Sequence, residues 1–254
     1  MFCFNVANMR LARCVVKRNN STWYGAGLFA VNSSVTVADC LFSSNVSEES
    51  GGGGGLHFYV ATGSSVERCF IEYNEGMGGG GMELHESDVS TENCVFFGNV
   101  AITYYGGGMH CWESSPRVVN CTFWDNTAAV YGGALSCFDG SNPVLTNCIL
   151  WNNTAPVSPE IYADATSTPS VTYCDIGGSG GSGAGWDTAI GTDGGGNIDV
   201  EPMFVDAGNR DFHLKSDSPC KDTGDPTTTL AEDIEGSPRP AGLGYDMGAY
   251  EYQP

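Results

Sequence analysis

The chain has 254 residues, of which 41% are hydrophobic and only 16% charged, so it can bury an extended core and does not have the composition of a disordered protein. Ten Lys and Arg against thirty Asp and Glu give a formal net charge of −20, which argues against nucleic acid or anionic membrane surfaces as partners. No apolar run approaches the length of a transmembrane helix.

The chain begins with MFCFNVANMRLARC, which lacks the cationic segment and long apolar run of a signal peptide. The segment is typical of the middle of the repeat described next. Because solenoids protect their terminal coils with a polar cap, we expect the natural start to lie upstream, in further coils.

A repeat of 25 to 29 residues occupies most of the chain. Its first landmark is a cysteine, at Cys14, Cys40, Cys69, Cys94, Cys121, Cys148 and Cys174. Its second is an asparagine five positions after each of the first six cysteines, at Asn19, Asn45, Asn74, Asn99, Asn126 and Asn153. Its third is a glycine run closed by an aliphatic residue, as in GGAL at 132–135.

Apolar residues alternate over short runs around these landmarks, which is the period of a strand and not of a helix. Three short strands and three turns in about 26 residues form one coil of a right-handed parallel β-helix, a single-stranded solenoid with strands roughly 4.8 Å apart. Equivalent side chains then stack. We expect an inward ladder of cysteines, a larger apolar ladder two residues later, and an asparagine ladder that satisfies buried backbone groups at a turn.

Eleven cysteines would suggest a disulfide framework in a secreted protein. Stacked cysteines on parallel strands, however, sit at or beyond the usual Cβ separation for a bridge. We therefore expect buried free thiols in preference to disulfides. The cysteines then indicate neither an oxidising nor a reducing compartment.

The repeat ends after Cys174, and the chain is predicted to have three parts. Residues 1–176 form the coils, and the Gly- and Ser-rich segment 177–197 is predicted to be a loop excursion. Residues 198–254 are predicted to form a closing coil and cap, with Met203, Phe204, Phe212 and Leu214 as core contacts.

The strands that follow the glycines carry the side chains that could bind a ligand or take part in catalysis. One predicted outward file holds Phe29, His57, Glu83, His110 and Ser136, and the next holds Val31, Tyr59, His85, Trp112 and Phe138. Aromatic rings stack on sugar rings, and paired carboxyls can cleave a glycosidic bond. The candidate ligand-binding residues are Tyr59, His85, Trp112, Phe138, Tyr105 and Tyr131, and the candidate catalytic residues are Glu83, His85, His110 and Glu113. The alternative is that these outward residues stack only for stability.

Metal binding is weighed at two places. His57, Glu83 and His110 are ordinary zinc ligands on consecutive coils, but the rings would have to lean together, so no metal site is predicted there. Calcium is considered near Asp199, Glu201, Asp206 and Asp211, where no EF-hand spacing is present and a structural role in turns is favoured.

GGAL at 132–135, with FSSN at 42–45, FFGN at 96–99 and FWDN at 123–126, resembles the GGA[ILV] and FxxN repeats of polymorphic outer membrane proteins. Residues 197–225 and DIEGSPRPAGLGYDMGAYEY are similar to the C-terminal end of bacterial β-helix proteins of the choice-of-anchor Q type. The resemblance implies a right-handed parallel β-helix on a secreted or surface-anchored bacterial protein, often adhesin-like. Val16, Ile71 and Leu150 depart from the phenylalanine of FxxN.

Two functions follow from the sequence. The favoured one is a non-catalytic module for binding, adhesion or display, with carbohydrate or another cell-surface ligand as partner. The competing one is a polysaccharide lyase or glycoside hydrolase on the same face. Neither Arg68 nor Arg117 is placed like the proton-abstracting base of pectate lyases, and the motifs of polygalacturonase-like hydrolases are not found.

Overall fold

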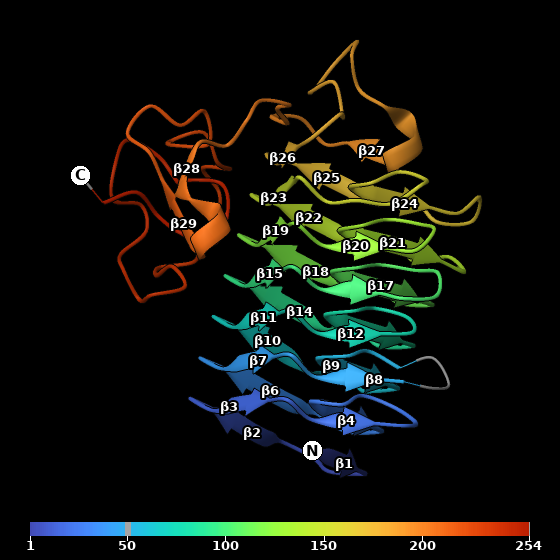
Figure 1. Cartoon of the computed structure of the whole chain (residues 1–254). Coiled ribbons are helices and arrows are strands. Elements are labelled where there is room, and N and C mark those ends of the chain that lie inside the picture. Colours follow the sequence, from blue (N-terminus) through green and yellow to red (C-terminus); the bar gives the residue numbers. More distant parts are fainter. Residues whose placement is uncertain (49–51, 254) are drawn as a thin grey trace.

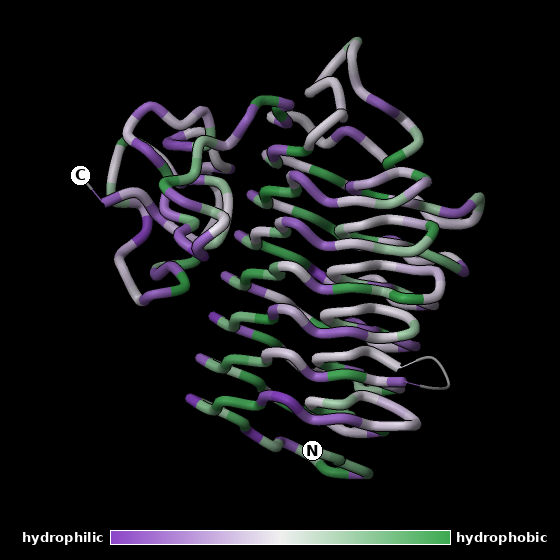
Figure 2. The backbone as a smooth tube through the Cα atoms, viewed as in Figure 1, coloured by the Kyte–Doolittle hydropathy of each residue, from purple (hydrophilic) through white to green (hydrophobic). Residues whose placement is uncertain are grey.

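The computed structural model describes residues 1–48 and 52–253 and consists of a stack of coils with a C-terminal lobe at its side (Figure 1). Each coil adds one strand to each of several parallel sheets, and hydrophobic segments recur at corresponding places of successive coils (Figure 2). The predicted all-β solenoid is therefore confirmed. Among the described residues the only helical segments are two short 3-10 turns, η1 (Thr188–Ile190) and η2 (Ala207–Asn209).

Three long parallel sheets form the walls of the solenoid. Sheet 1 contains β1 (Phe2–Phe4), β5 (Leu28–Val31), β9 (Leu56–Tyr59), β13 (Met82–His85), β17 (Met109–Trp112), β21 (Leu135–Phe138) and β24 (Ile161–Ala163). Sheet 2 contains β2 (Met9–Ala12), β6 (Val35–Ala38), β10 (Ser65–Glu67), β14 (Ser90–Glu92), β18 (Arg117–Val119), β22 (Val144–Thr146), β25 (Ser170–Thr172) and β27 (Thr192–Asp193). Sheet 3 contains β3 (Val15–Lys17), β7 (Leu41–Ser43), β11 (Phe70–Glu72), β15 (Val95–Phe97), β19 (Thr122–Trp124), β23 (Ile149–Trp151) and β26 (Asp175–Ile176).

A fourth sheet adds a two-residue strand to five of the coils, beyond the three strands per coil that the sequence predicted. Sheet 4 contains β4 (Asn20–Ser21), β8 (Val46–Ser47), β12 (Glu75–Gly76), β16 (Val100–Ala101) and β20 (Thr127–Ala128). These strands directly follow the ladder asparagines, so the chain resumes pairing as soon as the turn is complete.

The asparagine ladder connects six coils. The amide Nδ2 of each asparagine donates to the Oδ1 of the next, over 2.8 to 3.0 Å from Asn19 to Asn153. The same Oδ1 accepts the backbone N–H of the preceding asparagine. Nδ2 of each of the five asparagines after Asn19 also donates to a carbonyl one coil back, such as Asn99 to Ile71 at 2.8 Å. The ladder ends on Glu160, whose carboxylate accepts from the side chain and the backbone of Asn153. The inward amide stack is confirmed.

The cysteines form a second inward ladder. They stand directly before the strands of sheet 3, whereas the asparagines follow those strands. The sulfur of one cysteine accepts the backbone N–H of the cysteine before it, as in Cys94 to Cys121 at 3.4 Å, while its own thiol donates to a carbonyl two residues earlier. All eleven cysteines are unpaired, as expected. Burial raises the pKa of the Cys94 thiol well above its ordinary value, so it stays protonated.

The segment 177–197 closes the end of the solenoid, although a loop excursion was expected. Its strand β27 extends sheet 2 by pairing with β25, Ile190 is buried in the solenoid core, and Trp186 packs against that core. Asp193 holds the segment together by accepting bonds from Ser182 and from the backbone of Gly183. The absence of periodicity therefore marks a cap.

The C-terminal lobe, residues 202–253, lies along the flank of sheet 3, where a closing coil across the end had been expected (Figure 1). It contains a small antiparallel pair, β28 (Phe204–Asp206) and β29 (Asp211–Leu214). Phe204, Phe212 and Leu214 are buried as predicted, but they pack on the outward residues of sheet 3 in a second apolar cluster. The physical reason is the outward face of sheet 3, whose apolar side chains Val95, Phe97 and Ile149 need a cover.

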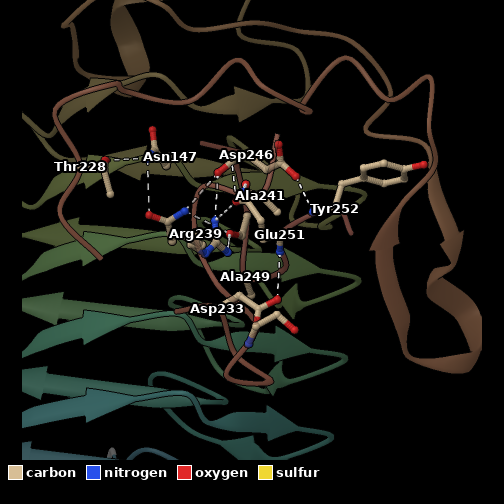
Figure 3. Close-up of polar contacts among 12 residues, drawn as sticks. Asn147, Thr228, Asp233, Arg239, Ala241, Asp246, Ala249, Glu251 and Tyr252 are labelled. Carbon is tan, nitrogen blue, oxygen red and sulfur yellow. Dashed lines mark hydrogen bonds and ion pairs between the residues drawn. The ribbon is translucent and has the colours of Figure 1, made fainter. Parts of the chain in front are cut away.

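Polar contacts fix the lobe to the coils (Figure 3). Asn120 donates to the carbonyl of Asp246 at 3.1 Å, and Asn147 donates to Thr228 at 2.8 Å. Inside the lobe, the fully buried guanidinium of Arg239 lies 3.2 Å from the carboxylate of Glu251 and donates to the carbonyl of Gly248. This ion pair is buried and hydrogen-bonded, so it orders the lobe on the flank.

Candidate functional site

Sheet 1 places the candidate residues in the expected register. His57, Glu83, His110 and Ser136 are direct partners on β9, β13, β17 and β21, and Tyr59, His85, Trp112 and Phe138 are partners two residues later. The residues between them point into the solenoid core, so both files point out of it.

The first file is outward but is not open to solvent, which corrects the expectation of an exposed row. His57, Glu83 and His110 have exposed fractions of only 2%, 7% and 2%. The glycine-rich segments before the strands fold back over this file. A Cβ atom at Gly78 would lie 2.7 Å from Oε2 of Glu83, so the backbone lies directly on the carboxyl group, and a larger residue here would require the Glu83 side chain to shift.

The glycine-rich segment around Gly78 forms a roof over Glu83, and a pocket opens beside it. The pocket volume is about 320 Å³, at the small end of the range for ligand sites. Glu83 and His110 contribute a carboxyl group and an imidazole to its lining. The remaining lining residues are Met77, Gly78, Thr103, Tyr104, Tyr105 and Trp112. Tyr105 stacks on His110 with ring centroids 4.9 Å apart, and Thr103 donates to the Met77 sulfur at 2.9 Å.

Glu83 is the group in this pocket with the most perturbed chemistry. Its Oε2 is buried and has no hydrogen-bond partner among the described residues. Burial raises the pKa of Glu83 to about 8, because removal from water disfavours the carboxylate. The carboxyl group is therefore protonated at neutral pH in the empty pocket.

The two histidines beside Glu83 stay neutral. Burial lowers the pKa values of His57 and His110 to about 3. Nδ1 of His110 lies 2.8 Å from Oγ of Ser136, whereas neither ring nitrogen of His57 has a hydrogen-bond partner among the described residues. Neither histidine supplies a positive charge or a strong base at neutral pH.

The other two candidate catalytic residues lie outside the pocket lining. His85 is half-buried in the second file, with Nε2 3.6 Å from Oε1 of Glu86 and its ring 4.7 Å from that of Tyr59. Glu113 is exposed and has the left-handed backbone of a corner, at φ 47°. The structure therefore brings Glu83 and His110 together at the pocket and leaves His85 and Glu113 elsewhere on the coil.

The candidate ligand-binding aromatics form a band of contacting rings along sheet 1. Trp112 stacks on Phe138 at 6.3 Å, Tyr105 stacks on Tyr131 at 6.0 Å, and Tyr105 meets Phe138 edge-on at 4.5 Å. Ring faces that pack on one another are not free for a sugar. Of the six predicted residues, only Tyr105 and Trp112 line the pocket.

No group of three His, Cys, Asp or Glu side chains with the arrangement of a metal site occurs in residues 1–48 and 52–253. The four acidic residues considered for calcium are separate. Asp199 accepts the backbone N–H groups of Gly178 and Gly180, Asp206 accepts from Asn209, and Asp211 lies 2.7 Å from His213. Glu201 is exposed.

Met77, Gly78, Thr103 and Tyr104 were missed as pocket residues. They lie in the segments between sheets 4 and 1, whose length and composition vary from coil to coil, so no periodicity locates them. The one usable signal was the tyrosine pair in AITYYGGGM at 101–109, which comes immediately before His110.

Comparison with known proteins agrees with the architecture. A family model described as "Right handed beta helix region" matches residues 77–192, which include β13, β17 and the pocket between them. No curated protein and no solved structure matches the chain. Within the described residues, no helix is both long and apolar enough to cross a membrane. The chain has the right-handed parallel β-helix fold.

Proposed function

We propose that the chain is a carbohydrate-binding module of a secreted or cell-surface protein and that it holds one sugar ring in the pocket between Glu83, Tyr104 and Trp112. The observation that carries the proposal is the combination of aromatic walls with a buried carboxyl oxygen that has no hydrogen-bond partner in the part of the chain that the structure describes. Rings provide apolar contact for a pyranose, and the carboxyl group provides a directed hydrogen bond to a hydroxyl or amine.

The resemblance of the repeats to those of surface proteins supports a location outside the cell. The net charge of −20 supports solubility there and disfavours anionic polymers as ligands. A host or cell-surface glycan that is neutral or cationic is consistent with both features.

An enzymatic role is the second candidate, because a carboxyl group that stays protonated to about pH 8 is what a general acid requires. A glycosidase also needs a second carboxyl group, and Glu83 is the only carboxyl-bearing residue among the described residues that line the pocket. A lyase needs a base, and His110 is too weak a base with its lowered pKa. Binding without turnover is therefore the better-supported function.

A glycan array followed by titration calorimetry tests the proposal. Trp112→Ala removes one wall of the pocket and should weaken glycan binding by at least about tenfold, or roughly 1.4 kcal/mol. Tyr73→Ala is the matched control, because Tyr73 is 48% exposed and follows β11 on sheet 3. Glycan binding that is equal in the parent and Trp112→Ala would contradict the pocket assignment.

Turnover is measured on the same glycans by reducing-end and unsaturated-product assays. If the parent cleaves a glycan and Glu83→Gln does not, the chain is an enzyme and not a non-catalytic binding module. An absence of both binding and cleavage on every glycan would refute both functions.

A further inference from the structure

Glu83 has a deficit of positive charge around it. Its Oε2 is buried without a hydrogen-bond partner among residues 1–48 and 52–253, and none of the lining residues within those ranges is Lys or Arg. Buried carboxylates in proteins are ordinarily paired with a cation or hydrogen-bonded. Burial therefore keeps the Glu83 carboxyl group in its neutral, protonated form, and its carboxylate form requires a cation that the described lining residues do not supply.

The groups that face Glu83 do not supply this charge. His57 on β9 and His110 on β17 flank it as direct strand partners, and both are neutral because burial lowers their pKa values to about 3. The roof above the carboxyl group is the uncharged backbone of Gly78. Tyr105, which packs on His110, has a raised pKa because of burial and is uncharged at neutral pH.

The walls favour a cation as well. Tyr104 and Trp112 line the pocket with electron-rich rings, and Met77 contributes a polarisable sulfur. Tyr104 and Tyr105 have centroids 5.4 Å apart, and His110 lies between Tyr105 and Trp112 with centroids at 4.9 and 6.4 Å. Aromatic walls around a carboxyl group are the chemistry that proteins use to hold ammonium groups.

We infer that the pocket selects a sugar ring that carries a protonated amino group, such as a de-N-acetylated hexosamine residue of a glycan, with Glu83 as its counterion. This inference rests on the proposed carbohydrate-binding function and names the ligand class of that site. The ammonium group donates to the free Oε2, and its charge replaces the missing cation. The strongly negative chain draws an amine-rich glycan toward it.

The ion pair has a proton balance that can be measured. In the empty pocket the carboxyl group of Glu83 carries a proton up to about pH 8. When an ammonium group binds, it favours the carboxylate, so the proton leaves to the buffer and no other bond changes. At about pH 6 the amine is already protonated, and binding should release up to one proton.

The experiment compares a chitin oligosaccharide with its fully de-N-acetylated counterpart of equal length. Titration calorimetry at about pH 6 in two buffers of different ionisation enthalpy measures affinity and proton release together. For the parent we expect the amine form to bind at least about tenfold more tightly and to release a proton, whereas the acetylated form releases none.

Glu83→Gln keeps the shape of the side chain and should abolish the preference for the amine form. Glu67→Gln removes the same charge from sheet 2 and should leave that preference unchanged. Circular dichroism confirms that each variant is folded. The proton release of the parent tests the inference without any variant, should Glu83→Gln fail to fold.

Equal affinities in the parent, a preference that survives in Glu83→Gln, or binding without proton release would each overturn the amine inference. Binding of the acetylated form alone would overturn it and leave the carbohydrate-binding function standing. Failure of both oligosaccharides and of every other glycan to bind would refute the two together.

Discussion

The asparagine ladder gives the sharpest prediction about stability. In the centre of the stack, Asn99 makes five ladder hydrogen bonds. Four of them involve its side chain and are lost on substitution by alanine, whereas the bond from its backbone N–H remains. Its backbone and side chain donate to Asn126, its side chain donates to Ile71, and its Oδ1 accepts from the backbone and side chain of Asn74. The side chain has no exposed surface through which water could replace these bonds.

The magnitude follows from the groups that lose a partner. Asn99→Ala orphans the backbone N–H of Asn74 and one amide hydrogen of the Asn74 side chain. The carbonyl of Ile71 loses its side-chain donor, while Asn126 keeps the backbone donor of residue 99. Each buried unsatisfied group costs about 1 to 3 kcal/mol. Allowing for local relaxation, we expect the free energy of unfolding to fall by about 3 to 5 kcal/mol.

Urea denaturation followed by far-ultraviolet circular dichroism measures this loss. Asn19→Ala is the matched control, because Asn19 is exposed, accepts no ladder bond, and leaves Asn45 with a backbone donor. Its cost should be below about 1 kcal/mol. Equal costs for the two variants, or an Asn99→Ala midpoint that matches the parent, would refute the reasoning.

Three further predictions concern charge and sulfur. Burial raises the pKa of Glu160 to about 8, above its unfolded value. Its contribution to stability is therefore complete below about pH 4.5, falls by about 1.4 kcal/mol per pH unit between about pH 4.5 and 8, and is lost above pH 8. Glu160→Gln should flatten this slope in denaturation curves measured across that window, and an unchanged slope would contradict the assignment. Arg239→Met leaves the buried carboxyl group of Glu251 without its cation and should lower the free energy of unfolding by about 3 to 5 kcal/mol. Limited proteolysis of this variant should cleave the C-terminal lobe first. In the control Arg117→Ala, which removes an exposed ion pair, the lobe should resist the protease as well as in the parent. A thiol titration of the unfolded protein should count eleven thiols with and without reductant, and a lower count without reductant would reveal disulfides.

The coils could be predicted because their side chains obey a local rule. A cysteine and an asparagine five residues apart recur once per turn of the solenoid, and each needs its equivalent one coil away to satisfy a buried donor. Such a rule leaves a period in the sequence. The same period gave the registers of His57, Glu83 and His110, which the structure has as strand partners.

The burial of that file could not be predicted, because it depends on the path of the glycine-rich segments. A glycine that turns a corner and a glycine that lies on a carboxyl group, as Gly78 does on Glu83, are identical in the sequence. The pocket is formed by this roof and by the aperiodic Tyr104 and Tyr105, so its place followed only from the fold.

The sequence contains one signal for the position of the C-terminal lobe. Asn93, Asn120 and Asn147 stand just before the core cysteines of three successive coils, where earlier coils carry Asp39 and Arg68. All three donate to the lobe, to the carbonyl of Glu232, the carbonyl of Asp246 and the hydroxyl of Thr228. A surface position that becomes asparagine over a stretch of coils therefore marked the docking site.

The state of the Glu83 carboxyl group is the central claim, since both the binding function and the preference for an amine depend on it. Carbon-13 NMR of the glutamate carboxyl carbons, with Glu83 assigned by comparison with Glu83→Gln, measures its titration directly in the free protein. The account predicts a pKa of about 8 that falls when the de-N-acetylated oligosaccharide is added. A pKa near the ordinary glutamate value of about 4.3 would contradict it, because the carboxyl group would then be hydrated or already paired.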